Sequence, residues 1–153
     1  GRVVSNFVVQ ALQGKPLSVF GDGSQTRSFC YVDDLVRGII ALLMVSSDTT
    51  VAQRTDRTSF LTKQNGSLET MHQPVNIGNP RELTVLTIAN MVIKLTDSSS
   101  KISFHPLPAD DPKVRRPDIT RARTLLGWEP LVDLEDALLK TIRYFQKALG
   151  GRQ

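Results

Sequence analysis

Residues 15–35 of this chain read KPLSVFGDGSQTRSFCYVDDL, two strand-like runs on either side of a glycine-rich turn. The first run, Leu17 to Phe20, is short, apolar and rich in residues that favour strands. The triplet Gly21-Asp22-Gly23 predicts a turn, because glycine tolerates positive φ and aspartate can bond its own backbone. An extended pattern is expected to resume over residues 29–32, so the chain should reverse direction at this turn.

A single arginine, Arg27, follows the turn and is expected at its rim. A planar guanidinium with five N–H donors can hold two phosphate oxygens at once. One interpretation of Arg27 is therefore a residue that holds an anion. A solvated loop arginine without a specific partner is the other.

Composition limits the classes of protein to consider. The chain has 153 residues, of which 40% are hydrophobic and 22% charged, as expected for an ordinary globular domain. Nineteen Lys and Arg against fifteen Asp and Glu give a net charge of +4, too mild an excess to predict a nucleic-acid partner. The lone Cys30 excludes an internal disulfide and indicates a small core residue, and His72 and His105 lack a second ligand at metal spacing, so no metal site is predicted. No targeting signal or membrane-spanning run is recognised either.

Helical and alternating patterns follow one another along the chain, which predicts a small α/β fold. Helices are expected over residues 3–13, 35–43, 84–95, 118–126 and 133–149, and strands over residues 17–20 and 102–104. Residues 74–80 are expected to form a short strand that runs into a loop. Asp33 or Asp34 is expected to cap the second helix, so Asp34 is interpreted as structural rather than catalytic. The apolar faces of the first and last helices are expected to need a partner outside this chain.

Residues 46–73 differ from the rest in composition. Ten of these 28 residues are Ser or Thr and six are apolar, without a sustained period, which predicts a disordered insertion. Asn65 begins a glycosylation sequon there, which we interpret as a chance occurrence. Residues 1–45 and 74–150 are then expected to form one lobe, with residues 151–153 as a tail.

Several motifs, taken in order, identify a family. They are GRVVSNF at residues 1–7, the run at 16–35, PVNIGNP at 74–80, DDPKVRRPDITRAR at 110–123 and LLGWEP at 125–130, followed by an amphipathic helix. In this order they resemble the C-terminal part of the UDP-glucuronate decarboxylases, which are extended short-chain dehydrogenases of the epimerase/dehydratase superfamily. GDGSQTRSF with YVDDL is shared widely in that superfamily, whereas GRVVSNF, QTRSF and RRPDI favour the decarboxylases.

The resemblance implies a reaction. In that family NAD oxidises C4 of the glucuronate ring, carbon dioxide leaves, and the hydride returns to give UDP-xylose. The chain would supply the UDP-sugar-binding half of the site, without the N-terminal Rossmann domain that holds most of the NAD, and would be inactive alone. No catalytic residue is expected here, because Tyr31 and Tyr144 are followed four residues later by Leu35 and Ala148 rather than by lysine.

The resemblance also implies roles for particular residues. Arg27 would grip the UDP diphosphate, Arg115 would reach the nucleotide-sugar, and Arg2 would lie near the cofactor. The strand containing Leu17, Val19 and Phe20 would border the uracil ring with its backbone and apolar side chains. Asn6 and Gln25 would make further polar contacts.

Other expectations concern partners and alternatives. The family implies a homodimer, and a Golgi location for an animal or type II enzyme or a cytoplasmic one otherwise. Two alternatives remain open: a fragment with dTDP-glucose 4,6-dehydratase-like or epimerase chemistry, and a non-catalytic UDP-sugar-binding or interaction module.

Overall fold

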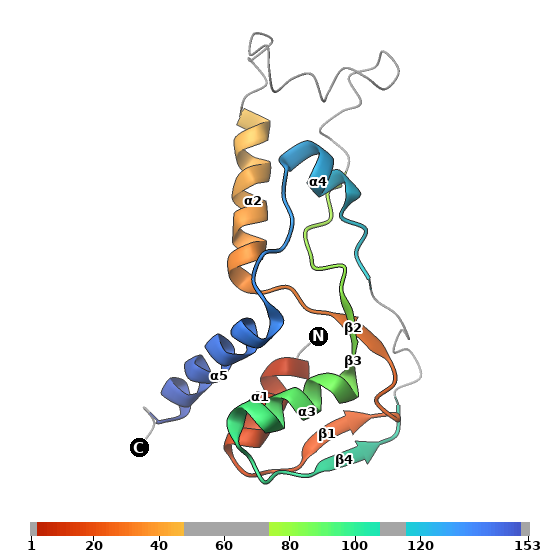
Figure 1. Cartoon of the computed structure of the whole chain (residues 1–153), viewed down its shortest axis with the longest axis vertical. Helices are drawn as coiled ribbons and strands as arrows, with labels where there is room; N and C mark the ends of the chain where they lie inside the picture. Colours follow the sequence, from red (N-terminus) through yellow and green to blue (C-terminus); the bar gives the residue numbers. More distant parts are fainter. Residues whose placement is uncertain (1–2, 48–73, 108–115, 151–153) are drawn as a thin grey trace. The chain divides into compact units, whose positions relative to one another are not determined.

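The structure, a computed structural model, describes residues 3–47, 74–107 and 116–150 (Figure 1). The chain divides into two compact units. Unit 1 comprises residues 1–29, 81–116 and 132–153, and unit 2 comprises residues 30–80 and 117–131. The expected insertion lies almost wholly outside the described residues, as does the expected tail, and the proposed division into one interrupted lobe remains a prediction.

Among its described residues, unit 1 has two small sheets and three helices. Its elements are α1 (Val3–Leu12), β1 (Leu17–Phe20), β2 (Thr26–Ser28), β3 (Glu82–Thr84), α3 (Val85–Thr96), β4 (Ile102–His105) and α5 (Leu134–Gly150). β1 pairs in parallel with β4, with Leu17 opposite Ile102 and Phe20 opposite His105. β2 pairs antiparallel with β3. The mixed α/β fold predicted from the sequence is confirmed.

The glycine-rich turn does not make a hairpin, which corrects the expectation of a simple reversal. β1 and β2 belong to different sheets, and each pairs with a strand from the second half of the chain. The second strand also lies earlier than expected, at residues 26–28, because Val32 already begins α2. Arg27 is therefore a strand residue rather than a residue at the rim of the turn.

The core of unit 1 lies between its helices and β1. Its buried side chains come from α1, β1, α3 and α5: Phe7, Val8, Ala11, Leu17, Val19, Val85, Ile88, Ala89, Val92, Leu138 and Ile142. Burial of each larger apolar side chain contributes about 1.5–3 kcal/mol. The apolar faces of α1 and α5 were expected to need a partner outside this chain. That expectation is wrong for the residues that these two helices bury in this core.

Local side-chain and glycine signals mark the ends of three helices. Thr84 is the N-cap of α3, and its hydroxyl oxygen accepts from the Thr87 backbone N–H at 3.0 Å. Asp133 precedes α5 and accepts from the Glu135 backbone N–H at 2.9 Å. Gly127 ends α4 in the left-handed conformation, with φ of 58°.

Unit 2 is built from α2 (Val32–Ser47), α4 (Thr120–Leu126) and extended segments. Its buried core consists of Ile119, Ala122 and Trp128. Residues 74–80 form no strand, contrary to the prediction, although Val75 and Ile77 do pack against this core. No described strand pairs with this segment. Its apolar side chains therefore pack against the core, but its backbone forms no strand-to-strand hydrogen bonds.

Candidate functional site

The carboxyl ends of the parallel strands β1 and β4 meet at one surface of unit 1. The rings of Phe20 and His105 are 5.6 Å apart between centroids and tilted by 40°. The Gly21 backbone N–H donates to the His105 carbonyl oxygen at 2.8 Å. Leu107 lies close by, since a Cβ added to Gly21 would meet its Cδ1 at 3.4 Å. Ligands of α/β folds bind at the carboxyl ends of parallel strands, so this is the first place to look for a site.

The loop between β1 and β2 is held by its own polar groups. The Gln25 side-chain amide donates to the Phe20 carbonyl oxygen at 2.7 Å. The Asp22 carboxylate accepts from both the backbone N–H and the hydroxyl of Ser24, at 2.9 and 2.6 Å. Those bonds hold the pKa of Asp22 below its ordinary value of 3.8, with the Ser24 hydroxyl the largest cause. We call Phe20, Gly21, Gln25, His105 and Leu107 the carboxyl-end surface.

The same loop also docks on the start of α3. The backbone N–H of Val85 donates to the Gln25 carbonyl oxygen at 3.0 Å, and that of Leu86 to the Gly23 carbonyl oxygen at 3.1 Å. These N–H groups have no partner within their own helix, so the loop satisfies donors that would otherwise need water or an anion. The loop is thus a fixed part of unit 1, and α3 does not offer an open anion site.

Arg27 lies on β2 and is half-buried. It pairs across the sheet with Leu83, and the bond from the Thr26 hydroxyl to Glu82 Oε1, 2.7 Å long, fixes the register next to it. One guanidinium nitrogen donates to the Thr26 carbonyl oxygen at 2.7 Å. This bond engages one of five N–H donors and holds the side chain near its own strand.

The other residues predicted for the site are distributed differently. Phe20 is 47% exposed, whereas Leu17 and Val19 are 0% exposed and belong to the core, so only their backbone could touch a ligand. Asn6 is exposed on α1. Arg2 and Arg115 lie outside the described residues, and the roles of all these residues remain predictions.

One supporting residue escaped the sequence analysis. The Gln10 side chain on α1 accepts from the Ser18 backbone N–H at 3.1 Å and donates to the Ser18 hydroxyl at 3.0 Å. Gln10 therefore provides hydrogen-bond partners for Ser18 at the edge of β1 that is not paired with β4. No local signal marks a helical glutamine for this task, because the pairing depends on how α1 packs against β1.

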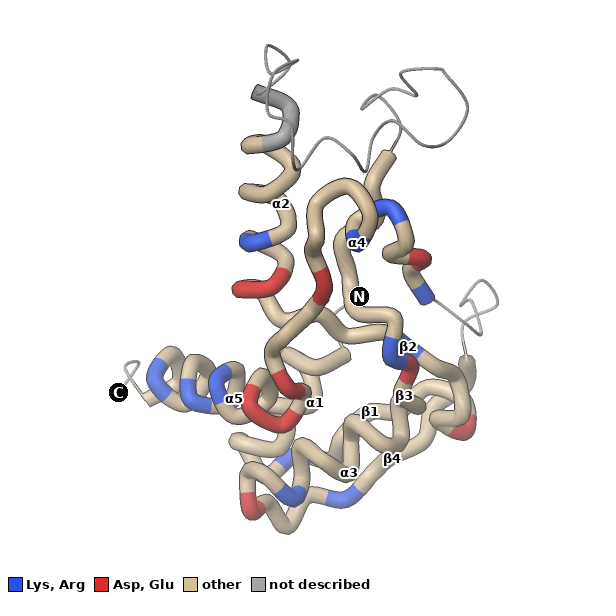
Figure 2. The backbone as a smooth tube through the Cα atoms, turned by 45° about the horizontal axis from the view of Figure 1, so that its top comes forward, with Lys and Arg blue, Asp and Glu red and all other residues tan. Residues whose placement is uncertain are grey.

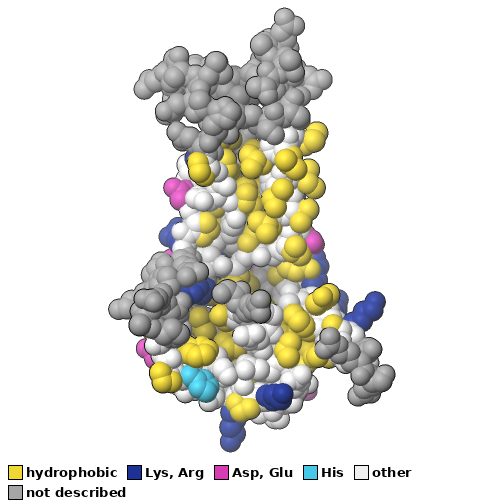
Figure 3. Space-filling model, turned by 180° about the vertical axis from the view of Figure 1, so that it is seen from behind, with side chains coloured by type: hydrophobic (Ala, Val, Ile, Leu, Met, Phe, Trp, Pro, Cys, Tyr) yellow, Lys and Arg dark blue, Asp and Glu magenta, His cyan; other side chains and the backbone are white. Residues whose placement is uncertain are grey.

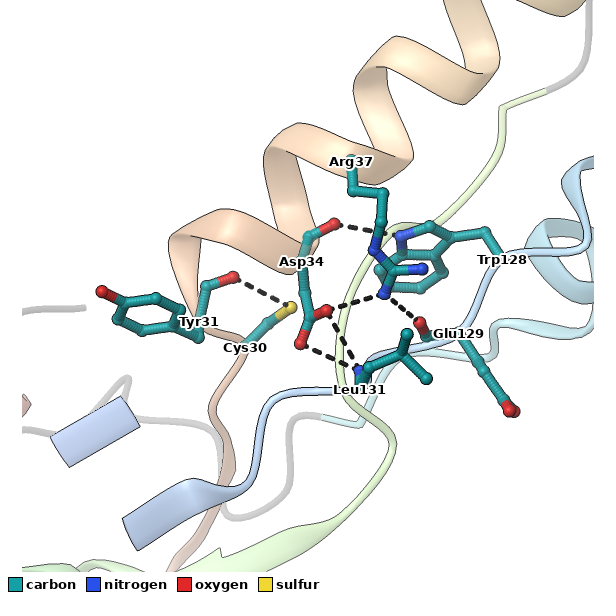
Figure 4. A network of polar contacts seen from close by, with 7 residues as sticks. All are labelled: Cys30, Tyr31, Asp34, Arg37, Trp128, Glu129 and Leu131. Atoms are coloured by element: carbon teal, nitrogen blue, oxygen red, sulfur yellow. Dashed lines mark hydrogen bonds and ion pairs between the residues drawn. The ribbon is translucent and has the colours of Figure 1, made fainter. Parts of the chain in front are cut away.

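Unit 2 contains a buried polar network centred on Asp34 (Figure 4). The Asp34 carboxylate accepts from Arg37 at 2.7 Å and from the Leu131 backbone N–H at 3.0 and 3.1 Å. Arg37 also donates to the Glu129 carbonyl oxygen at 2.6 Å. The structural interpretation of Asp34 is confirmed, although it lies inside the first turn of α2 and holds the segment after Trp128 rather than capping the helix.

Cys30 is part of the packing of unit 2, as predicted. It is half-buried and lies against the core around Trp128. Burial, and secondarily the negative charge of Asp34, raise the pKa of its thiol above the ordinary value of 9.0. Cys30 is therefore a packing residue rather than an activated nucleophile.

The described part of the chain shows neither a metal-binding cluster nor a helix suited to span a membrane. No group of three or more His, Cys, Asp or Glu side chains there could hold a metal ion. Of the helices described, none combines the length and the apolar character needed to cross a membrane.

This chain is similar to proteins of one known family. Residues 1–52 match the model of the NAD dependent epimerase/dehydratase family. The UDP-glucuronic acid decarboxylase 1 of Danio rerio is 47% identical over 97% of this chain, and UDP-glucuronic acid decarboxylase 4 of Arabidopsis thaliana is 43% identical over 100% of it. The chain spans about 30% of the length of these curated relatives.

Solved structures show the same fold. UDP-glucuronic acid 4-epimerase from Bacillus cereus, in complex with UDP-glucuronic acid and NAD, is similar with a TM-score of 0.74 and 29% identity over 95% of this chain. UDP-glucose 4-epimerase from Thermotoga maritima, with UDP-glucose, has a TM-score of 0.74 and 29% identity over 96% of it. This chain covers 40% of each.

The fold and the comparisons together show that this chain is similar to a part of the proteins of the NAD dependent epimerase/dehydratase family, whose model residues 1–52 match. Within that family, the resemblance to the UDP-glucuronic acid decarboxylases is confirmed over nearly the whole chain.

Proposed function

We propose that this chain supplies the UDP-sugar-binding part of an NAD-dependent UDP-glucuronic acid decarboxylase, which forms UDP-xylose and carbon dioxide. The observation that carries the proposal is the 47% identity to such a decarboxylase over 97% of the chain. The structural neighbour crystallised with UDP-glucuronic acid and NAD supports a nucleotide-sugar ligand. The chain would correspond to the C-terminal portion of the enzyme.

The ligand would bind to unit 1. The half-exposed ring of Phe20 offers an apolar surface for the uracil, next to backbone groups at the end of β1. Arg27 would hold the diphosphate, because a guanidinium matches two phosphate oxygens and its strand is fixed in register. Gln25 would act mainly by holding the loop through its bond to Phe20.

The residues of this chain do not fit as the main holders of NAD. The 153 residues contain neither a G-x-G-x-x-G run nor a Tyr-x-x-x-Lys pair. Hydride transfer is the chemistry that NAD supplies. We therefore assign to this chain the binding and orientation of the UDP-sugar, and no chemical step. The complete enzyme would hold NAD mainly in another part of the fold and would form a homodimer.

A second candidate is a part of a 4-epimerase, because the solved structures with 29% identity include two epimerases that act on UDP-sugars. Binding of UDP-glucuronic acid, UDP-glucose and dTDP-glucose to the chain tests the UDP-sugar ligand that both candidates share. We expect UDP-glucuronic acid to bind at least as tightly as UDP-glucose, and both to bind more tightly than dTDP-glucose. A preference for dTDP-glucose, or no binding at all, would contradict the proposal.

Turnover provides the second half of this test. The chain alone, incubated with UDP-glucuronic acid and NAD, should release no UDP-xylose or carbon dioxide. Detection of either product would show that the chain holds a complete site. In that case the assignment of binding without chemistry would be wrong.

A further inference from the structure

The Gln10 side chain joins α1 to β1 by two hydrogen bonds. Its Oε1 accepts from the Ser18 backbone N–H at 3.1 Å, and its Nε2 donates to the Ser18 hydroxyl at 3.0 Å. The Gln10 carbonyl oxygen also accepts from the Lys15 backbone N–H at 2.9 Å, in the segment between the two elements. α1 carries no charged side chain (Figure 2), and Gln10 is its longest polar one. We call these three bonds the Gln10 clamp.

The clamp acts on the edge of β1 that does not pair with β4. Backbone N–H and C=O groups of successive strand residues point to alternate edges of a strand. Because the Gly21 N–H bonds to β4, the polar backbone groups of Ser18 and Phe20 point to the opposite edge. Gln10 binds the Ser18 N–H at one end of this edge, and Gln25 binds the Phe20 carbonyl oxygen at the other. The two glutamines therefore fix both ends of this edge.

The attachment of α1 to unit 1 does not depend on the clamp. Phe7, Val8 and Ala11 of α1 are buried in the core together with the apolar side chains of β1. The Ser98 hydroxyl also donates to the Ala11 carbonyl oxygen at 2.9 Å. Apolar packing is not directional, whereas a side-chain amide with two bonds restrains the orientation of the peptide group that it binds. The specific contribution of Gln10 is thus to orient the backbone at Ser18.

Both elements that the clamp joins carry residues expected to contact a ligand. Asn6 lies one turn before Gln10 on the same side of α1 and is exposed. Phe20 lies two residues after Ser18 on β1 and is exposed as well. Figure 3 shows this end of β1 at the surface, with hydrophobic side chains beside the histidine of the carboxyl-end surface. A shift of β1 against α1 would change the distance between these two positions.

We infer that Gln10 is a positioning residue for the base of the UDP-sugar. It acts through Ser18, by fixing the strand backbone that carries Phe20, and does not itself contact the ligand. The inference rests on the proposed function, which places the uracil beside Phe20 and the backbone at the end of β1. Without the clamp, the Ser18 N–H would need another partner, and water bound at this edge would compete with the base.

The test compares two matched substitutions. Gln10→Met keeps the length of the side chain and removes both of its hydrogen-bonding atoms. Gln13→Met makes the same change at an exposed position just past the end of α1. Binding of UDP and of inorganic pyrophosphate, which has the diphosphate but no base, is measured by NMR titration. Circular dichroism during heating checks that each variant is folded at the temperature of the titration.

We expect Gln10→Met to weaken UDP binding about fivefold or more and to change pyrophosphate binding by less than about twofold. Gln13→Met should bind both ligands like the unmodified chain. Arg27→Ala should instead weaken the binding of both, because both contain the diphosphate. A purely structural role of Gln10 would not produce a loss that is confined to the ligand with a base.

A conservative variant tests the bond itself. Gln10→Glu keeps an acceptor for the Ser18 N–H, and the Ser18 hydroxyl can donate to its carboxylate. We expect this variant to bind UDP within about threefold of the unmodified chain. A loss of UDP affinity as large as that of Gln10→Met would contradict the assignment of the effect to the bond with the Ser18 N–H.

Two results for Gln10→Met would overturn the inference. One is a UDP affinity equal to that of the unmodified chain, and the other is an equal loss for UDP and pyrophosphate, which would indicate general loosening of unit 1. UDP binding that Arg27→Ala weakens and Gln10→Met leaves unchanged would overturn the inference alone and support the proposed function. Failure of the unmodified chain to bind UDP would contradict the proposed function and the inference together.

Discussion

The indole N–H of Trp128 donates to the main-chain carbonyl oxygen of Asp34 at 3.0 Å, while the Asp34 carboxylate accepts from the Leu131 backbone N–H. One residue of α2 thus holds both sides of the corner that Trp128, Glu129 and Pro130 form. The corner and the helix fix each other, which explains why the polar side of α2 is the packed side.

Removal of the Asp34 carboxylate should loosen the corner. We expect Asp34→Ala to lower the free energy of unfolding by about 2–3 kcal/mol, because a buried N–H and a guanidinium lose a charged acceptor. Trp128, the chain's single tryptophan, reports unfolding by fluorescence in a denaturant titration. Asp136→Ala, at an exposed position in the first turn of α5, is the control and should change stability by less than about 1 kcal/mol. Equal losses for both would contradict the role of Asp34.

Gly38 should resist a substitution that normally stabilises helices. Alanine is favoured over glycine in a helix by about 1 kcal/mol. At Gly38, however, the new Cβ would meet Ile77 Cγ2 at 2.6 Å and the Trp128 ring at 3.0 Å. Gly38→Ala is therefore expected to destabilise the chain by about 1–3 kcal/mol. Gly150→Ala, where a Cβ meets nothing within 4 Å, should be neutral or stabilising in the same titration, and a stabilising Gly38→Ala would refute the close packing.

The Asp22 turn should respond to acid. Because the pKa of Asp22 is lowered from 3.8, its bonds to Ser24 favour the folded loop above that pH, and this contribution is lost as the pH falls through the folded-state pKa. The carboxyl resonance followed by NMR should titrate below pH 3.8. Ser24→Ala removes the largest cause and should move the midpoint upward. An unchanged midpoint in that variant would show that the Ser24 hydroxyl does not stabilise the carboxylate.

The Cys30 thiol should react slowly. Burial and the charge of Asp34 raise its pKa above 9.0, so less thiolate is present near neutral pH than for a free cysteine. Alkylation by iodoacetamide at pH 8 should be slower in the folded chain than in the same chain unfolded in urea. A folded-state rate equal to or above the unfolded rate would contradict the packed environment of Cys30.

The sequence predicted elements whose signals are local. Thr84 and Gly127 mark helix ends by their own chemistry, and the helices expected over residues 84–95 and 118–126 begin and end next to them in the structure. The pairing of β1 with β4 could not be predicted, because it joins residues 17–20 to residues 102–105 across two helices. The strand expected over 74–80 failed for the same reason: an apolar alternation forms a strand only where a neighbouring strand offers hydrogen bonds.

The candidate site shows the same limit. The spacing of Arg27 from the glycine turn suggested a loop residue, whereas pairing with β3 makes it a strand residue with a fixed register. The apolar stripe of α2 was evident from its period, but periodicity does not reveal what covers a helix face. The burial of Leu17 and Val19 likewise follows from the packing of α1 and α3 on β1 rather than from the strand alone.

The measurement that tests the central claim most directly is calorimetry of UDP with this chain and with its Arg27→Ala variant. Arg123→Ala, an exposed arginine on α4, is the control for the loss of one positive charge. A guanidinium that grips the diphosphate contributes about 1.5–3 kcal/mol, so Arg27→Ala should weaken UDP binding by about one to two orders of magnitude, while Arg123→Ala should bind like the unmodified chain. Equal affinities for UDP in all three proteins would contradict the assignment of the diphosphate site to Arg27.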